Sequence, residues 1–196
     1  MARPQSPDYD KRREAMVRAA AHLFARRGFQ GASVADLAEA CQTSKSLVYH
    51  YFPSKEDILY EVMAAHLEAL VDAADDVMRT GDARERLHAL ALAFMRLYEG
   101  AQDSHKVLLN ELDNLPPARR DEVVRKQRRI IAVVESLLQE IRPDAAPRAL
   151  PLTMLFFGMI NWTHTWFRSG GAMSAEALAD MAVDVMLNGL ERAEVS

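Results

Sequence analysis

The chain has 196 residues, of which 49% are hydrophobic and 27% are charged, a composition typical of globular proteins rather than disordered chains. No segment approaches the roughly 20 uncharged apolar residues that a membrane span requires, and the first residues lack the apolar core of a signal peptide, so we expect no association with membrane. The single cysteine, Cys41, cannot form an intramolecular disulfide, which favours a reducing cytoplasm.

The net charge of −4 argues against nucleic acid as a partner, but the charge is unevenly distributed. Residues 1–55 contain nine Lys or Arg and five Asp or Glu, a net charge of +4. The remainder contains 15 basic and 23 acidic residues, a net charge of −8. A basic N-terminal part suggests contact with a polyanion, although an acidic body is also common in proteins that bind no nucleic acid.

Signals for helix starts and ends recur along the whole chain. Apolar residues at three- and four-residue spacing predict a first helix that Gly28 ends, and Ser33 with Asp36 forms the capping box of a short second helix. No segment shows the alternation of a strand. We therefore predict an all-α fold of about nine helices, near residues 8–27, 34–40, 44–51, 55–80, 83–99, 103–114, 117–141, 147–168 and 175–193.

Residues 33–52 fit a helix-turn-helix, with a seven-residue helix, a short turn and a second short helix. The second helix has a polar face of side chains that reach base edges or phosphates, namely Lys45, Ser46, Tyr49 and His50. The helix starts at Ser33 and Ser44 offer backbone N–H groups to phosphate, and Lys55 opens the following helix. An ordinary helical hairpin is the alternative for this segment.

Three stretches, at 20–29, 33–38 and 44–59, resemble the TetR family of repressors. The resemblance implies a DNA-binding domain at 8–55 and a ligand-binding and dimerisation domain at 56–196, with double-stranded DNA, a small-molecule effector and a second copy of the chain as partners. It adds Thr43, Ser44 and Tyr51 to the residues expected at DNA, although the residue pattern assigns Tyr51 partly to packing. Ser46 stands where many members have Gly or Ala.

The segment 156–168 combines aromatic and polar side chains, as a small-molecule pocket does. Trp162 and Trp166 lie one turn apart, and aromatics at this spacing also occur in cores and dimer seams. We predict a ligand site formed by Phe94, Tyr98, Met159, Asn161, Trp162, Thr165, Trp166 and Arg168.

The same segment resembles TetR-type repressors of fatty-acid, steroid and aromatic-acid catabolism, which implies an acyl-coenzyme A thioester as effector and Arg168 at its polar end. A basic helix at 119–129 either binds the phosphates of such a ligand or forms a solvated face. The alternative is a multidrug-responsive repressor of an efflux pump, whose carboxylates would come from Glu99, Glu111 and Asp113. A regulator that is controlled by a protein partner and binds no small molecule is a third alternative.

The last predicted helix has apolar residues three and four positions apart, among them Leu178, Met181 and Val185. This spacing favours a four-helix dimer interface over a purely intrachain core. No metal motif, nucleophile motif or phosphate-binding glycine loop is present, so we expect a regulator without metal or cofactor and not an enzyme. His105 and Glu111 resemble an acid–base pair, but we expect His105 on the surface.

Overall fold

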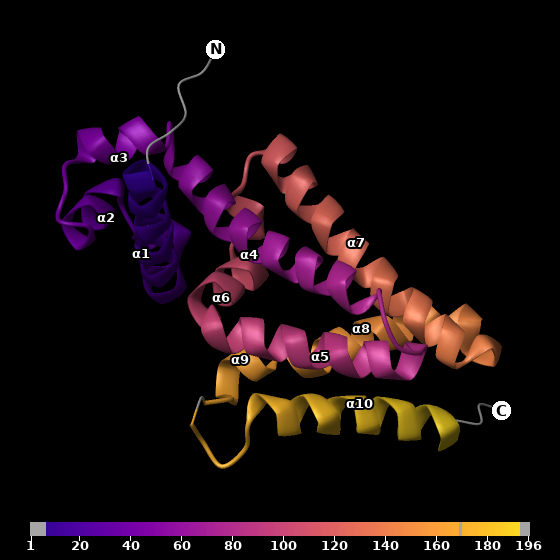
Figure 1. Ribbon diagram of the computed structural model, residues 1–196. Coiled ribbons are helices and arrows are strands. Elements are labelled where there is room, and N and C mark those ends of the chain that lie inside the picture. The colour runs from indigo at the N-terminus through magenta and orange to yellow at the C-terminus, as the bar shows by residue number, and fades with distance from the viewer. Residues whose placement is uncertain (1–6, 169, 193–196) are drawn as a thin grey trace. The chain divides into compact units, whose positions relative to one another are not determined.

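The structure, a computed structural model, describes residues 7–168 and 170–192, and all regular elements in these ranges are helical, which confirms the all-α prediction (Figure 1). None of these helices combines the length and apolar character needed to cross a bilayer. The elements are α1 (Pro7–Gly31), α2 (Val34–Ala40), α3 (Lys45–Tyr51), α4 (Lys55–Val77), α5 (Ala83–Gly100), α6 (Gln102–Asn110), the 3-10 helix η1 (Leu112–Asn114), α7 (Pro117–Ile141), the 3-10 helix η2 (Pro143–Arg148), α8 (Ala149–Asn161), α9 (Thr163–Trp166) and α10 (Ala175–Arg192).

Two compact units divide the described residues. The first unit contains the residues up to His66 together with Asp103–Val124. The second contains Leu67–Gln102 and the residues from Arg125 onward. The helices α4 and α7 therefore each contribute residues to both units, and α6 and η1 belong to the same unit as the N-terminal helices.

The core of the first unit forms where α1, α2 and α3 pack together (Figure 1). Phe24 of α1, Leu37 of α2 and Val48 of α3 are all buried, and Phe52 closes the end of α3. Ala38 is 4% exposed, because a small side chain is needed where two short helices cross closely. This packing fixes the orientation of α3 from its apolar side.

The segment 103–124 is attached to α1 by polar contacts within the first unit. His22 and Asp103 are paired at 2.9 Å between Nδ1 and Oδ2, and the Gln30 amide donates a 2.9 Å hydrogen bond to Asn114 Oδ1. We call this segment the saddle. Its contacts hold residues from the middle of the chain against the N-terminal helices.

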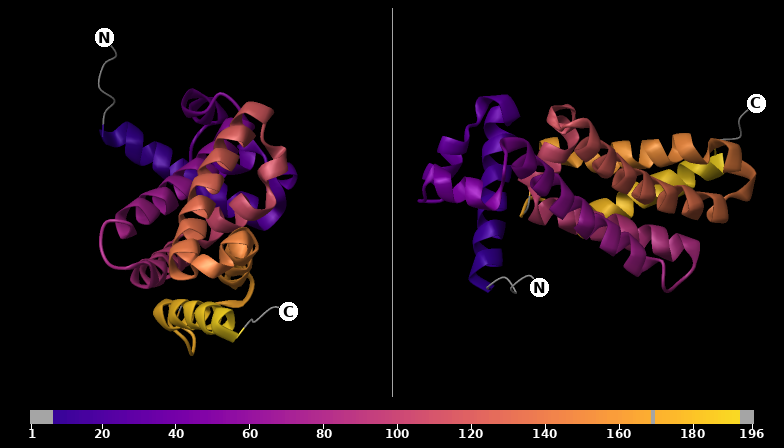
Figure 2. Two further views of the ribbon diagram at one scale, coloured as in Figure 1. Left: turned by 90° about the vertical axis from the view of Figure 1, so that its right-hand side faces the viewer. Right: turned by 90° about the horizontal axis from the view of Figure 1, so that it is seen from above.

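In the second unit α10 packs along α5 and also contacts α8 (Figures 1 and 2). The α8 residues Thr153, Phe156, Phe157 and Ile160 share its buried face, at the spacing of a helix with one apolar side. On α10 the buried residues include Ala179 and Val183. The second unit therefore has its own apolar core between α5, α8 and α10.

Two predicted helices differ in detail. The helix predicted at 147–168 is divided into η2, α8 and α9, and Trp162 lies between the last two, where the Thr163 hydroxyl donates to the Ile160 carbonyl. The helix predicted at 103–114 ends at Asn110 and continues as η1. Gly28 interrupts α1 as predicted, with φ 72° and ψ 161°, values that a glycine adopts without strain.

Candidate DNA-binding surface and effector region

The helix α3 presents a polar face from a fixed base. The Ser44 hydroxyl accepts a 3.1 Å hydrogen bond from the Leu47 N–H and so caps the helix start. Val48 is completely buried, whereas Tyr49 is 50% exposed. Lys45, Ser46 and His50 are also exposed. The structure therefore places the four side chains that sequence assigned to base and phosphate contacts on one accessible surface.

The helix α2 begins with the predicted capping box. The Asp36 N–H donates to the Ser33 hydroxyl at 3.1 Å, and the Ser33 N–H donates to Asp36 Oδ2 at 2.8 Å. The Ser33 hydroxyl, followed by its backbone N–H, lowers the pKa of Asp36, and Arg27 adds an ion pair at 3.0 Å. The Ser33 hydroxyl therefore serves in the cap. A phosphate at this helix start would bind groups near Ser33 rather than its hydroxyl.

The turn between α2 and α3 has a defined backbone. Gln42 has a positive φ of 51°, and the Thr43 N–H donates to the Ala38 carbonyl at 2.8 Å. Cys41 and Thr43 line a cavity of about 400 Å³ together with Arg12 and Leu47. Burial raises the pKa of the Cys41 thiol, which agrees with a packing role in the turn.

Tyr51 lies in an aromatic cluster that sequence reasoning missed. Its ring stacks on Tyr9 of α1 with centroids 4.4 Å apart, and Tyr9 also meets the edge of His50 at 6.4 Å. Tyr51 therefore packs against a specific partner, Tyr9, in line with the expectation that it serves partly in packing. No local pattern links Tyr9 to α3, because the two helices are brought together only by the tertiary fold.

Lys55 occupies the first position of α4. Its Nζ lies 4.1 Å from the centroid of the Phe29 ring, a cation–π contact. The contact with the Phe29 ring fixes the position of the Lys55 ammonium group. Lys55 is half-buried, so its charge is less hydrated than that of a fully exposed lysine.

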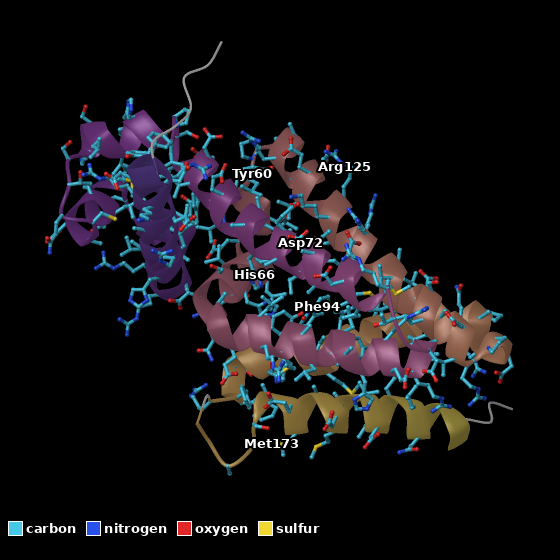
Figure 3. The ribbon with its side chains drawn as sticks, in the orientation of Figure 1. Tyr60, His66, Asp72, Phe94, Arg125 and Met173 are labelled. Carbon is cyan, nitrogen blue, oxygen red and sulfur yellow. The ribbon has the colours of Figure 1, made fainter. Side chains whose placement is uncertain are left out.

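Three of the predicted ligand residues meet in the second unit. The Tyr98 hydroxyl donates a 2.9 Å hydrogen bond to Asn161 Oδ1, and Phe94 lies 6.1 Å from the Tyr98 ring between centroids. Phe157, which was not predicted, stacks on Phe94 at 6.4 Å. Burial strongly raises the pKa of Tyr98, so the phenol stays protonated. Figure 3 labels Phe94 on α5.

The other predicted ligand residues do not join this cluster. Trp162 is 64% exposed and Trp166 52% exposed, Thr165 and Arg168 are also exposed, and Met159 is half-buried. The Arg168 guanidinium donates to the carbonyl of Phe167. Leu150, Met154 and Leu155 of α8 are likewise large apolar residues that are at least half exposed.

Thr153 is a buried polar residue that sequence reasoning missed. It is 0% exposed, and its Oγ1 has no hydrogen-bond partner among the described residues. It shares the buried face of α8 with Phe157. A threonine in an apolar helix face gives no sequence signal that distinguishes an unpaired hydroxyl from one bonded to its own helix.

Three side chains of the predicted basic helix, which is the first half of α7, form ion pairs with α4. In the first unit Arg119 contacts Asp57. In the second, Lys126 pairs with Glu68 and Arg129 with Asp75. Arg125 and Arg128 are exposed.

The expectation that His105 lies on the surface is wrong. His105 is 1% exposed and lies beside His66 of α4, with 3.1 Å between His66 Nε2 and His105 Nδ1 (His66 is labelled in Figure 3). The helix α6 turns this histidine inward, as its strong amphipathic pattern with Val107 and Leu108 requires. Across residues 7–168 and 170–192, no three His, Cys, Asp or Glu side chains gather as a metal site would need.

Comparisons with known proteins agree with this arrangement. Residues 16–62 match the family model for bacterial regulatory proteins of the tetR family, and residues 80–190 match that for the tetracyclin repressor-like C-terminal domain. The HTH-type transcriptional repressor KstR2 of Mycolicibacterium smegmatis is 27% identical over 97% of this chain and 97% of its own.

Two solved structures extend the likeness. A TetR-family transcriptional regulator from Bordetella parapertussis is 38% identical with a TM-score of 0.87, over 94% of this chain and 98% of its own. AibR, solved in complex with isovaleryl coenzyme A and operator DNA, shares the fold at 24% identity with a TM-score of 0.79, over 89% of this chain and 97% of its own. The chain belongs to the TetR family of bacterial regulatory proteins and is a TetR-type transcriptional repressor.

Proposed function

We propose that this repressor binds a palindromic operator as a homodimer and is released when a small molecule, an acyl-coenzyme A thioester, occupies its C-terminal domain. The observation that carries the DNA-binding part is the polar face of α3, with Lys45, Tyr49 and His50 exposed above a buried Val48. The proposed contact set is completed by Ser33, Thr43, Ser44, Ser46, Tyr51 and Lys55.

The homodimer is supported by apolar side chains that face solvent in the second unit. Leu155 is 63% exposed, Trp162 64% and Val185 58%. Exposed apolar residues in such number on one unit indicate an interaction surface. A second copy is the occupant we propose, since two recognition helices must reach successive major grooves roughly 34 Å apart. Gly158 on α8 has open space around its Cα, which leaves room for a facing helix.

The interior of the second unit supports this effector class. The cluster of Phe94, Tyr98 and Phe157 is aromatic, and the buried polar side chains among the described residues of this unit, the Tyr98 phenol and the Thr153 and Thr163 hydroxyls, are all neutral. An uncharged acyl or aryl group suits such an interior, because a buried unpaired charge is costly. KstR2 as a relative and the coenzyme A thioester bound to AibR, a protein of the same fold, support a thioester.

The same observations disfavour the multidrug alternative. Pockets for cationic drugs usually combine aromatic rings with a buried carboxylate. Glu111 accepts a hydrogen bond from Asn114, Asp113 pairs with Arg120, and both belong to the first unit. Glu99 is half-buried. None of the three candidate carboxylates is buried in the second unit.

A thermal-melt panel tests the effector class. Purified repressor is melted with acyl- and aryl-coenzyme A thioesters, with the matching free acids and with cationic drugs. A ligand present at 100 times its dissociation constant adds about 2.7 kcal/mol to the free energy of unfolding. A shift with thioesters alone supports the proposal, and a shift with cationic drugs alone replaces it with the efflux alternative.

A salt titration tests the DNA-binding surface. A duplex enriched from a random-sequence library by the wild-type protein serves as the operator probe. Replacing Lys45 with Met should weaken binding and reduce the slope of log K against log salt by about 0.9, the amount for one lost phosphate contact. Lys106→Met removes the same charge from an exposed position of α6 and is the matched control. Equal slopes for the two variants would exclude Lys45 as a phosphate contact.

A further inference from the structure

Four side chains join the start of α4 to the start of α7 within the first unit. The Arg119 guanidinium carbon lies 4.1 Å from the centroid of the Tyr60 ring. Its Nη2 is 3.4 Å from Asp57 Oδ1, and its Nη1 is 3.4 Å from Glu122 Oε2. Glu122 completes the group, and its interaction with the Tyr60 hydroxyl raises the pKa of Tyr60. Figure 3 labels Tyr60 on α4. We call these four residues the Arg119 clamp.

Asp57 links this clamp to the DNA-binding surface. Its Oδ2 accepts a 2.7 Å hydrogen bond from the Ser54 hydroxyl, and its N–H donates to the same hydroxyl at 3.0 Å. This exchange caps α4. One carboxylate therefore caps the helix with one oxygen and contacts α7 with the other. Lys55, a proposed phosphate contact, is part of the same capped turn.

The geometry exceeds that of an ordinary surface ion pair. A single exposed pair contributes little because water screens it and both side chains lose freedom. The Arg119 guanidinium carbon instead lies over the Tyr60 ring, and each terminal nitrogen faces a carboxylate, an arrangement that uses the forked guanidinium and that a lysine cannot reproduce. Stacking and two charge contacts together restrict the group to one orientation.

The clamp is one of several attachments of the saddle to the N-terminal helices. Asp103 contacts His22 and Asn114 contacts Gln30, both at α1. The Arg119 clamp adds the contact with α4. Residues of α6, η1 and α7 thus hold two of the helices that frame α3.

We propose that Arg119 is a positioning residue for operator binding: the clamp fixes the first turn of α4, and with it Lys55 and the end of α3, to α7. An effector that displaces α7 would open the clamp and lower the population competent for DNA. The second step rests on the proposed function, whereas the first needs only DNA binding. Apparent affinity falls in proportion to the competent fraction, so loss of the clamp weakens binding without any lost DNA contact.

The test compares Arg119→Met, Arg119→Lys, Asp57→Asn and the double variant Asp57→Asn/Arg119→Met in the full-length protein. Arg120→Met is the matched control, since Arg120 is the next residue of α7 and its partner Asp113 is 87% exposed. We measure the dissociation constant for the selected duplex at several salt concentrations. We also measure amide hydrogen exchange over residues 54–60 without DNA.

We expect Arg119→Met to weaken binding about three- to tenfold with an unchanged salt slope, Arg119→Lys to recover only part of this loss, and the double variant to lose less than the sum of its singles. Amide exchange at 54–60 should accelerate in Arg119→Met and not in Arg120→Met. Wild-type affinity in Arg119→Met, or a slope reduced by about 0.9, would overturn the proposal. If the wild-type protein selects no duplex, DNA binding by this chain fails as a proposal, while unchanged exchange at 54–60 independently overturns the clamp.

Discussion

Tyr9 of α1 stacks on Tyr51 of α3 with ring centroids 4.4 Å apart and an interplanar angle of 26°. Tyr51 ends α3, and Tyr9 lies in the first turn of α1. The stack therefore braces the C-terminal end of the recognition helix from a helix that carries none of the predicted DNA contacts. Aromatic pairs of this geometry contribute about 0.5–1.5 kcal/mol beyond their buried area.

We predict that Tyr9→Ala weakens operator binding about three- to tenfold, because His50 and Tyr51 lose the ring against which they are ordered. Tyr9→Phe keeps the stacking ring and should bind like the wild type. Fluorescence anisotropy with the selected duplex measures both. Equal losses in the two variants would assign the effect to the Tyr9 hydroxyl instead, and hence to a direct DNA contact.

The N-terminal helices were predictable because their signals are local. The Ser33–Asp36 capping box, the break at Gly28 and the apolar position of Val48 all lie within a few residues of the structure they specify. The stack of Tyr9 on Tyr51 and the burial of His105 against His66 depend on helices that are distant in sequence. No periodicity within one helix contains that information.

The effector region was predicted less completely for a related reason. Tyr98 and Asn161 were both expected at the site, and they form a hydrogen bond with each other. A polar side chain on an apolar helix face needs a hydrogen-bond partner once it is buried. Trp162 and Trp166, which follow Asn161 in the chain, are instead exposed. The prediction that the two tryptophans contact the ligand rests on helical spacing alone, which does not say which face of a helix is covered in the folded chain.

The buried Thr153 hydroxyl gives a prediction on stability and ligand response together. A buried unpaired hydroxyl costs about 1–3 kcal/mol, and an apolar group of the same shape removes that cost. Thr153→Val should therefore increase the free energy of unfolding of the ligand-free protein by about 1 kcal/mol, measured by urea denaturation. It should also reduce the melting shift given by the best thioester, if this hydroxyl binds the ligand.

Thr163→Val serves as the comparison for Thr153→Val. The Thr163 hydroxyl is also buried but donates to the Ile160 carbonyl at 2.6 Å, so its removal should destabilise the protein. A loss of stability in Thr153→Val similar to that in Thr163→Val would show that Thr153 has a partner after all.

The apolar surface of α8 gives a prediction on assembly. Leu155→Glu places a charge among Leu150, Met154 and Trp162, all at least half exposed in one chain. If a second copy covers them, the buried charge disfavours association by several kcal/mol. We expect sedimentation velocity to show a dimer for the wild type and a monomer for Leu155→Glu, with operator binding lost in the monomer.

Gln139→Glu is the control for that charge, because Gln139 is an exposed residue of α7 in the same unit. It should remain dimeric and bind the operator normally. A dimer that persists in Leu155→Glu would move the interface off this face of α8.

The buried histidine pair makes stability depend on pH. Burial lowers the pKa of His66 to about 4, against 6.5 for the free side chain. Between these values the unfolded chain binds a proton that the folded chain does not, so the free energy of unfolding falls as the pH is lowered from 6.5 toward 4 and is unaffected by this group above 6.5. The slope is at most about 1.4 kcal/mol per pH unit, for a total of about 3 kcal/mol.

Urea denaturation at pH 7.5, 6.5, 5.5 and 4.5 measures this dependence, with His66→Gln as the diagnostic variant. Glutamine can still hydrogen-bond to His105 but does not titrate in this range, so the stability of His66→Gln should fall less steeply below pH 6.5 than that of the wild type. His50→Gln removes an exposed histidine and should follow the wild-type curve. Parallel curves for all three proteins would mean that His66 accepts a proton as readily in the folded chain as in the unfolded one, and that the contact between α4 and α6 opens easily enough to admit water.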